Sequence, residues 1–525
     1  MDPRAKAFPD DEGTPDRRIV YSVVFLAGFV GLGAELAGSR LLDPWFGNSI
    51  LVWAVLIGLI LLYLAVGYGL GGWLADRHPR PSLFLTLAAL AGLATGLIPL
   101  GARPILQRAA DVFIAYDLAL LVGALAATLA LFAPAVILLG CIAPFAIRIL
   151  VGGRDDAGRT AGRIFALSTT GSLLGVFVPV LVLLPNLGTR RTFLLMGLSL
   201  AGLATAALAR RRRRRAFLLA LVWTALAVLA LLPPPPLHGD ADTVFEQESA
   251  YNYLRVQRHG EELLLRLNEG AGIHSVYRPG GGLAEGIWDY FLLAPFFAPA
   301  PHHPADVDSL LILGLAAGTV ARLYTEAYGP IPIRGVELDP AIIAVGRRFF
   351  AMNQPNLTAV AGDARYVLRR DPGRYDVIAV DAYRPPYIPF HLTTVEFFVE
   401  VRRHLTPDGV VAVNVARTAT DDSLVMALAG TMAAVFPSVF ILDEPMAGFD
   451  LGNSLVVATK RPATLADFLA NTADLPEPLL AEVARRARPH ARPAPRTGPV
   501  LTDDRAAIEQ IVHGIVLRFL LTRLP

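Results

Sequence analysis

Long apolar runs fill the first half of the chain, and short alternating apolar and polar segments replace them in the second half. The runs lie near residues 19–39, 50–74, 82–101, 112–151, 163–184, 191–209 and 216–232. A helix needs about 20 apolar residues to cross the hydrocarbon core of a bilayer, and most of these runs are long enough. The pattern therefore predicts a transmembrane helical domain over residues 19–232, in a multi-pass protein of a bacterial-type inner membrane.

The fourth run leaves the number of spans open between seven and eight. Residues 112–151 fit either two helices broken at Pro134 or one crossing preceded by an interfacial piece. Seven spans with the N-terminus inside place most arginines, including the run Arg210–Arg215, on the cytoplasmic side, as the positive-inside rule expects. That arrangement sends the rest of the chain out of the cytoplasm, whereas eight spans keep it inside.

A few polar and small residues stand out within the apolar runs. Glu35 is a candidate functional carboxylate because charged groups are rare at membrane depth, and a pair with Arg40 at the interface is the alternative. Gly67 and Gly71 form a G-x-x-x-G pair, a spacing that lets two helix backbones approach closely. The single cysteine, Cys141, excludes an intrachain disulfide and a cysteine-based zinc cluster.

Composition and turn residues divide the whole chain into five parts. We expect a disordered tail at 1–18, the transmembrane domain at 19–232, a proline-rich linker at 233–242, a small β-strand domain at 243–284 and an α/β domain at 285–525. The polar, acidic tail does not resemble a secretory signal. A net charge of +2 gives no support to a nucleic-acid partner.

The second half alternates between buried β-branched strands and amphipathic helices from about residue 309 to residue 415. This alternation predicts a doubly wound, Rossmann-like parallel sheet. In such sheets, ligands bind at the carboxyl ends of the strands. The residues that follow each predicted strand are therefore the candidates for a binding site.

Three predicted strand ends carry residues suited to a nucleoside. Gly314 and Gly318 form a tight strand-to-helix turn, where the absence of a side chain lets a ligand approach the backbone. Glu337 comes 23 residues after Gly314, the spacing of a carboxylate that binds ribose hydroxyls. Asp363 ends the next strand, where it either accepts from an adenine amine or caps the following helix. The turn lacks a phosphate-binding glycine loop, which argues against a nucleotide diphosphate.

The second half resembles the polyamine aminopropyltransferases, the spermidine synthase family, over about residues 240–510. More narrowly, the chain resembles the multipass-membrane members in which a transporter-like domain is fused to a spermidine synthase. The segments that carry the resemblance are EQESAYNYLRV, GVELDP, GDAR, YDVIAVDAY and LTDDRAAIE. The resemblance implies a methyltransferase-like sheet preceded by a β-hairpin domain, and transfer of an aminopropyl group from decarboxylated S-adenosylmethionine to an amine.

The resemblance also implies roles for individual residues. Glu337 would hold the ribose of the donor, and Asp363 would hold the adenine. Asp381 would face the active site from the fourth strand end. Asn252 stands where the family has a glutamine near the sulfonium group.

Two departures from the family concern the acceptor side of the site. The glycine turn lacks the family's aspartate, and Arg384 occupies the position of the family's second catalytic aspartate. An arginine repels a cationic amine and cannot act as a base, so it favours an anionic acceptor such as a phospholipid headgroup. Asp381, Tyr383, His391 and Glu396 remain as candidate active-site groups, with His391 favoured as the base because imidazole titrates near neutral pH.

Three functions remain open at this point. The first is a membrane-embedded transferase that uses decarboxylated S-adenosylmethionine or S-adenosylmethionine, needs no metal, and alkylates a small-molecule or lipid acceptor. The second is a methyltransferase, and the third is a transporter or sensor with an inactive nucleoside-binding domain. Membrane lipids are expected partners, and a homodimer is left open. Because sulfonium donors are made in the cytosol, the C-terminal half is expected there.

Overall fold

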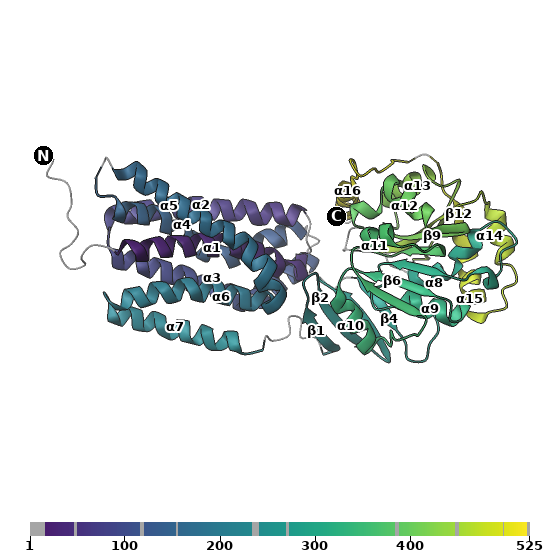
Figure 1. The fold of residues 1–525 in the computed structure, drawn as a ribbon, viewed down its shortest axis with the longest axis horizontal. Coiled ribbons are helices and arrows are strands. Elements are labelled where there is room, and N and C mark those ends of the chain that lie inside the picture. Colours follow the sequence, from purple (N-terminus) through teal and green to yellow (C-terminus); the bar gives the residue numbers. More distant parts are fainter. Residues whose placement is uncertain are drawn as a thin grey trace. The chain divides into compact units, whose positions relative to one another are not determined.

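The computed structural model describes residues 16–46, 50–115, 120–153, 156–233, 241–268, 272–383, 388–446, 451–496 and 498–521. The chain forms two compact units, Met1–Gly239 and Asp240–Pro525. The first unit is a bundle of long helices and the second is an α/β fold (Figure 1). The predicted fold class is therefore confirmed for both halves of the chain.

The described part of the first unit consists of long helices and the short segments that connect them. They are α1 Arg17–Phe46, α2 Ile50–Arg77, α3 Pro81–Ala115, α4 Leu120–Leu150, α5 Ala157–Val178, a π-helical turn Pro179–Leu183, α6 Leu184–Ala209 and α7 Arg213–Leu231. Six helical stretches of the described chain are long and apolar enough to cross a membrane. One of them, Ala157–Ala209, has 53 residues, about 80 Å of helix and more than twice the thickness of a hydrocarbon core. Gly188, with φ of 75°, divides this stretch into two helices.

The fourth apolar run does not contain a break at Pro134. Pro134 lies inside α4, which continues to Leu150, and residues 112–115 belong to the end of α3. The alternative of two helices broken at this proline is therefore wrong. A proline within a long helix removes one backbone hydrogen bond, which neighbouring helices in a bundle can tolerate.

Helices α2 and α4 pack with their backbones in close contact. A side chain on Gly67 would place its Cβ 2.4 Å from the carbonyl oxygen of Ile137, and one on Gly71 would meet the backbone of Cys141 at 2.5 Å. Asp76 at the end of α2 forms an ion pair of 3.0 Å with Arg148 at the end of α4. The two helices therefore run parallel, and the G-x-x-x-G pair lies at their interface.

The predicted ion pair between Glu35 and Arg40 is not formed. Arg40 instead lies 3.9 Å from Asp43, one turn further along α1. A separation of three residues brings Arg40 and Asp43 to the same side of the helix, whereas Glu35 lies five residues away.

The second unit begins with a four-stranded antiparallel sheet. Its strands are β1 Thr243–Glu248, β2 Tyr253–His259, β3 Glu262–Leu267 and β4 Ile273–Tyr277, and they pair in sequence order. Leu254, Val256 and Leu265 turn one side of this sheet into an apolar surface that packs against helix α10, Pro340–Phe349. The small β domain thus shares a core with the α/β fold that follows it.

An eight-stranded sheet forms the centre of the second unit. Its strands are β5 Leu310–Leu313, β6 Ile333–Glu337, β7 Leu357–Ala361, β8 Tyr375–Val380, β9 Leu405–Thr418, β10 Ser438–Asp443, β11 Leu451–Thr459 and β12 Ala491–Pro493. Their order across the sheet is β12-β10-β11-β9-β8-β5-β6-β7. The strands from β9 to β7 are parallel, as predicted, whereas β10, β11 and β12 add an antiparallel edge.

Helices cover both faces of this sheet. One face packs against α8 Ile287–Tyr290, the 3-10 turn Phe291–Phe297, α9 Thr319–Tyr328, α14 Leu465–Asn471 and α15 Pro478–Ala487. The other face packs against α11 Ala364–Arg370, α12 Val395–Arg403, α13 Ser423–Ala433 and α16 Ile508–Leu521. Because both faces are covered, ligands reach the sheet at its edge, where the parallel strands end.

Candidate active site

At two positions of the turn after β5, the backbone has a conformation that only glycine adopts without strain. Gly314 has φ of 99°, and a Cβ there would lie 2.4 Å from the carbonyl oxygen of Asp381. Gly318 has φ of 89° and caps the start of α9, where a Cβ would lie 2.7 Å from Met352. The turn therefore keeps the end of β5 in close contact with the end of β8.

Glu337 lies at the end of β6 with its carboxylate against this turn. It accepts the backbone N–H of Ala316 at 2.9 Å and that of Asp339 at 3.1 Å. Burial raises the pKa of Glu337 to about 7, although these two hydrogen bonds favour the charged form. A buried carboxylate with unused lone pairs at this strand end suits the two hydroxyls of a ribose.

Asp363 lies at the end of β7 and caps helix α11. One carboxylate oxygen accepts the backbone N–H of Tyr366 at 2.8 Å, and the other lies 2.9 Å from Nε2 of His391. The side chain is 43% exposed, so a ligand can reach it. His391 therefore belongs to the nucleoside end of the site, where its imidazole bonds Asp363.

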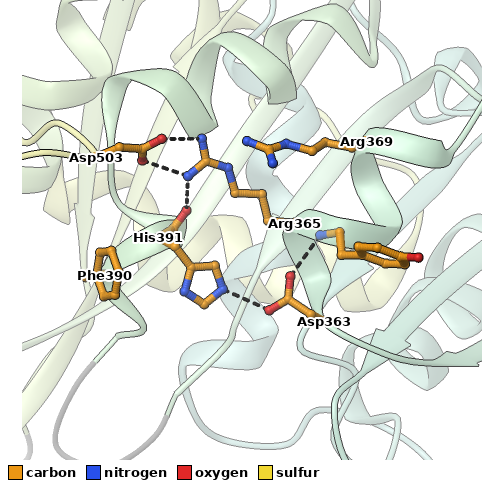
Figure 2. A pocket seen from close by; sticks show the side chains of 7 residues that line it. Asp363, Arg365, Arg369, Phe390, His391 and Asp503 are labelled. Carbon is orange, nitrogen blue, oxygen red and sulfur yellow. Dashed lines mark hydrogen bonds and ion pairs between the residues drawn. The ribbon is translucent and has the colours of Figure 1, made fainter.

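A pocket of about 340 Å³ opens beside this pair (Figure 2). It is lined by Asp363, Arg365, Tyr366, Arg369, Phe390, His391 and Asp503. Phe390 and Tyr366 are more than half exposed, and they provide aromatic surface next to the Asp363 carboxylate. Such surface is suited to an aromatic base whose amine is held by a carboxylate.

Arg365 fixes the wall of this pocket. Its guanidinium is 6% exposed and bonds Asp503 at 2.7 and 2.9 Å, Glu400 at 2.9 Å and the carbonyl oxygen of His391 at 3.0 Å (Figure 2). Asp503 also accepts from the hydroxyl of Thr394 at 2.7 Å, and its backbone N–H donates to Glu396 at 3.0 Å. The C-terminal segment that contains Asp503 is thereby joined to the strand end that carries Asp363.

Asp381 lies at the end of β8, on the acceptor side of the site. The side-chain amide of Asn414 donates to its carboxylate at 2.8 Å, and the indole N–H of Trp288 donates to it as well. Burial raises the pKa of Asp381 to about 6. The carboxylate is therefore ionised near neutral pH but close enough to its pKa to take up a proton.

Tyr383 has its hydroxyl engaged by the backbone of β9. It accepts the N–H of Ala416 at 2.6 Å and donates to the carbonyl oxygen of Asn414 at 3.2 Å. Burial raises its pKa above the ordinary range for tyrosine. These contacts hold the start of the loop against β9, so Tyr383 is placed to orient Asn414.

Two predicted residues remain, Asn252 and Arg384, and the structure describes only the first. The amide of Asn252 donates to Asp339 at 3.1 Å and accepts from Asn268 at 3.2 Å. Asp339 is fully buried at the start of α10, next to Glu337, so Asn252 links the small β domain to the ribose end. Arg384 lies outside the described residues.

Sequence reasoning missed several polar residues of the acceptor side, namely Trp288, Asn414, Glu444 and Asn453. They come from α8 and from the strands β9, β10 and β11 or their ends. Their strands are buried on both faces, so the available signal was only a polar residue within or beside a continuous apolar run, as for Asn414 in β9. Within the described part of the chain, no group of three or more His, Cys, Asp or Glu residues is arranged to hold a metal ion.

Comparison with known proteins identifies the family to which similar sequences belong. The family described as "Spermine/spermidine synthase domain" matches residues 305–445. A probable polyamine aminopropyl transferase of Bifidobacterium longum is 32% identical over 320 residues, which cover 57% of this chain and 69% of that protein. A polyamine aminopropyltransferase of Mycobacterium tuberculosis is 29% identical over 409 residues, or 68% of this chain and 73% of that protein.

A solved structure of a probable spermidine synthase from Corynebacterium glutamicum is also similar. It aligns with a TM-score of 0.38 and 22% identity, covering 49% of this chain and 97% of that one.

Proposed function

Because the chain belongs to the polyamine aminopropyltransferase family, we propose that its second unit transfers an aminopropyl group from decarboxylated S-adenosylmethionine to an amine and releases methylthioadenosine. The observation that carries this proposal is the constellation of Glu337, Asp363 and Asp381 at three strand ends of one sheet edge. The first two suit a nucleoside, and the third is a buried carboxylate with a pKa of about 6. The family membership supplies the reaction class.

The chemical step needs an uncharged amine and a place for its proton. The nitrogen lone pair attacks the aminopropyl carbon bonded to the sulfonium, a C–N bond forms, and the C–S bond breaks with its electron pair going to sulfur. Sulfur becomes neutral in methylthioadenosine, and the amine nitrogen loses one proton. Among the described carboxylates, Asp381 combines the place at the strand end with a pKa suited to accept that proton.

The acceptor side supports a cationic amine better than an anionic headgroup. Its described polar groups near Asp381 are the amide of Asn414 and the indole N–H of Trp288, and the carboxylate forms no ion pair with the described arginines. A half-buried carboxylate whose described partners are neutral attracts a cation and repels an anion. We therefore place a small amine, rather than a phospholipid, opposite Asp381.

Mass spectrometry of the purified protein with each donor and a set of amines tests this proposal. We expect methylthioadenosine only when an amine is present, and at least about 100-fold slower formation by the Asp381→Asn variant. S-adenosylhomocysteine from S-adenosylmethionine would instead identify a methyltransferase. Bound donor without either product would identify a sensor and overturn the proposal.

We also propose that the first unit spans a membrane and that the second unit is cytoplasmic. If the described stretch Ala157–Ala209 crosses twice, with Gly188 between the two crossings, and each of the other five stretches crosses once, the two ends of the bundle lie on opposite sides of the membrane. The cytoplasmic origin of the donor supports this placement, although the arginines at the opposite end of the bundle favour the reverse by the positive-inside rule. A reporter fused after Pro525 tests it, and activity of a periplasm-only reporter would overturn both this placement and the proposed enzyme.

A further inference from the structure

The two walls of the nucleoside pocket come from segments that are distant in the sequence. One wall is the first turn of α11, with the Asp363 carboxylate at its start, and the other is the 3-10 turn Phe390–Leu392. The imidazole of His391 bonds Asp363 at 2.9 Å. A flat base is held between two such walls only when the distance between them is fixed, so the contacts that join the two segments bear on ligand binding.

Arg365 joins the two walls. It lies in the first turn of α11, two residues after Asp363, and its guanidinium donates to the backbone oxygen of His391 at 3.0 Å (Figure 2). This hydrogen bond uses the backbone of His391, so it does not depend on the imidazole. The position of Arg365 therefore sets the distance between the 3-10 turn and the Asp363 carboxylate.

Two acids hold the guanidinium of Arg365. Asp503 accepts from both terminal nitrogens, at 2.7 and 2.9 Å, and Glu400 accepts from Nε and Nη2 along the other edge. Glu400 is also paired with Arg369 at 2.7 Å. Without the charge of Asp503, two guanidinium groups would share one carboxylate, and one of the two is 6% exposed. A buried cation that loses an acid partner is costly, so we expect Arg365 to shift when Asp503 is neutralised.

The segment that contains Asp503 has anchors of its own. Leu501 is 3% exposed, and its backbone N–H donates to the hydroxyl of Thr431 on α13 at 3.0 Å. The carbonyl oxygen of Leu501 accepts the backbone N–H of Val395 on α12 at 2.9 Å. These contacts do not involve the carboxylate of Asp503, so a substitution of that carboxylate leaves the segment attached to the two helices.

We infer that Asp503 is a positioning residue of the donor site, which acts through Arg365 and makes the pocket selective for an adenine base. Through these contacts it keeps the 3-10 turn Phe390–Leu392 opposite Asp363. Adenine presents an amine to the Asp363 carboxylate, whereas hypoxanthine presents an oxygen at the same place, which a carboxylate repels. When the wall moves, the base can shift away from the carboxylate, and selectivity falls together with affinity. This inference rests on the proposed function and adds to it the residue that sets base selectivity.

Binding of methylthioadenosine and of methylthioinosine to the full-length protein tests the role of Asp503. Calorimetry measures the two Kd values without turnover, and the ligands differ only in the base. We expect the unchanged protein to favour methylthioadenosine by about tenfold or more. The Asp503→Asn variant should raise the Kd of methylthioadenosine by about tenfold and that of methylthioinosine much less. In turnover, this variant should raise the donor KM and leave kcat at saturating donor unchanged.

Three further variants separate positioning from a general loss of stability. Asp504→Asn removes the same charge from the neighbouring residue, whose exposed carboxylate has no partner among the described residues, so both ligands should bind as before. Asp503→Glu keeps a carboxylate for Arg365 and should recover most of the preference for methylthioadenosine. In the Asp363→Ala background, where that preference is already lost, Asp503→Asn should reduce it no further.

Several results would overturn the inference alone. They are an equal loss of affinity for both ligands in Asp503→Asn, a preference for methylthioadenosine that this variant retains in full, and an unchanged protein without any preference. A fall in kcat that saturating donor does not reverse would also contradict it, because a residue of the donor site acts through donor binding. Absence of methylthioadenosine formation with every amine would overturn the proposed function, and the two Kd values would still decide the role of Asp503.

Discussion

The nucleoside end and the acceptor end of the site are built in different ways. At the nucleoside end, Gly314, Glu337 and Asp363 each follow a parallel strand directly, and each takes part in local turn or capping contacts. At the acceptor end, Asp381 and Asn414 lie on the neighbouring parallel strands β8 and β9, whereas Glu444 follows β10, which the antiparallel strand β11 separates from β9. We therefore expect donor recognition to rest on local motifs and acceptor recognition to depend more on the topology of the sheet.

The Asp381→Asn variant should separate the two ends most clearly. Loss of the carboxylate removes the group proposed to accept the proton, so kcat should fall by about 100-fold to 10,000-fold. Donor affinity, measured by calorimetry, should stay within about twofold of its original value, because the donor does not need this residue. A difference of that size is within the noise of the measurement. A comparable loss of donor affinity would show that the two ends are not independent. Asp408→Asn, at an exposed ion pair with Arg461, is the matched control.

The Glu337→Asp variant should affect the other end. Withdrawing the carboxylate from the ribose breaks charge-assisted hydrogen bonds, each contributing about 1.5–3 kcal/mol, so the donor Kd should rise about tenfold to 100-fold. At saturating donor, kcat and the acceptor KM should be preserved. The melting temperature checks that the loop around Ala316 still forms. An effect on kcat that saturating donor does not reverse would contradict the assignment of Glu337 to the donor.

The pH dependence of the donor Kd and that of kcat should report two separate ionisations, one at each end of the site. The donor Kd should rise as the pH falls below about 7, because Glu337 takes up a proton and can no longer accept two hydroxyl hydrogen bonds. At saturating donor, kcat should fall only below about pH 6, where Asp381 becomes protonated. Calorimetry and initial rates between pH 5 and 8 measure the two curves, which should differ by about one pH unit. Coincident curves would mean that one group controls both steps.

The His391→Ala variant should produce the smallest change. His391 occupies one oxygen of Asp363, so its removal leaves that oxygen free for the adenine amine, and donor affinity should rise about threefold. The value of kcat should not change, in contrast to a role of His391 as the catalytic base. A large fall in kcat at saturating donor would restore that role.

The fold and the nucleoside end could be read from the sequence because their signals are local. A strand followed by Gly314 or Glu337, and a helix after each, produces a recognisable period along the chain. The ends of β10 and β11 have no such signal, since their position depends on the antiparallel pairing of strands that follow the parallel part of the sheet. Asn414 and Glu444 were therefore missed, although Asn414 interrupts a continuous apolar run and Glu444 comes just after one.

The role of His391 illustrates a different limit. It was favoured as the base at the acceptor side only because its residue type titrates near neutral pH. In the structure, the 3-10 turn Phe390–Leu392 carries it to the strand end of Asp363. The direction of a side chain after a loop depends on where the loop returns to the sheet, and sequence spacing does not encode that.

The ion pair between Arg365 and Asp503 has a practical consequence for the design of shortened forms of this protein. A deletion that began at Gly498 would remove α16 and also Asp503, one of the two acids that balance a guanidinium with 6% exposure, beside Asp363, the residue proposed to bind the adenine. Part of the wall of the nucleoside pocket is thus supplied from the far end of the chain. Expression fragments that stop at residue 445, where the matched family region ends, would lack this wall.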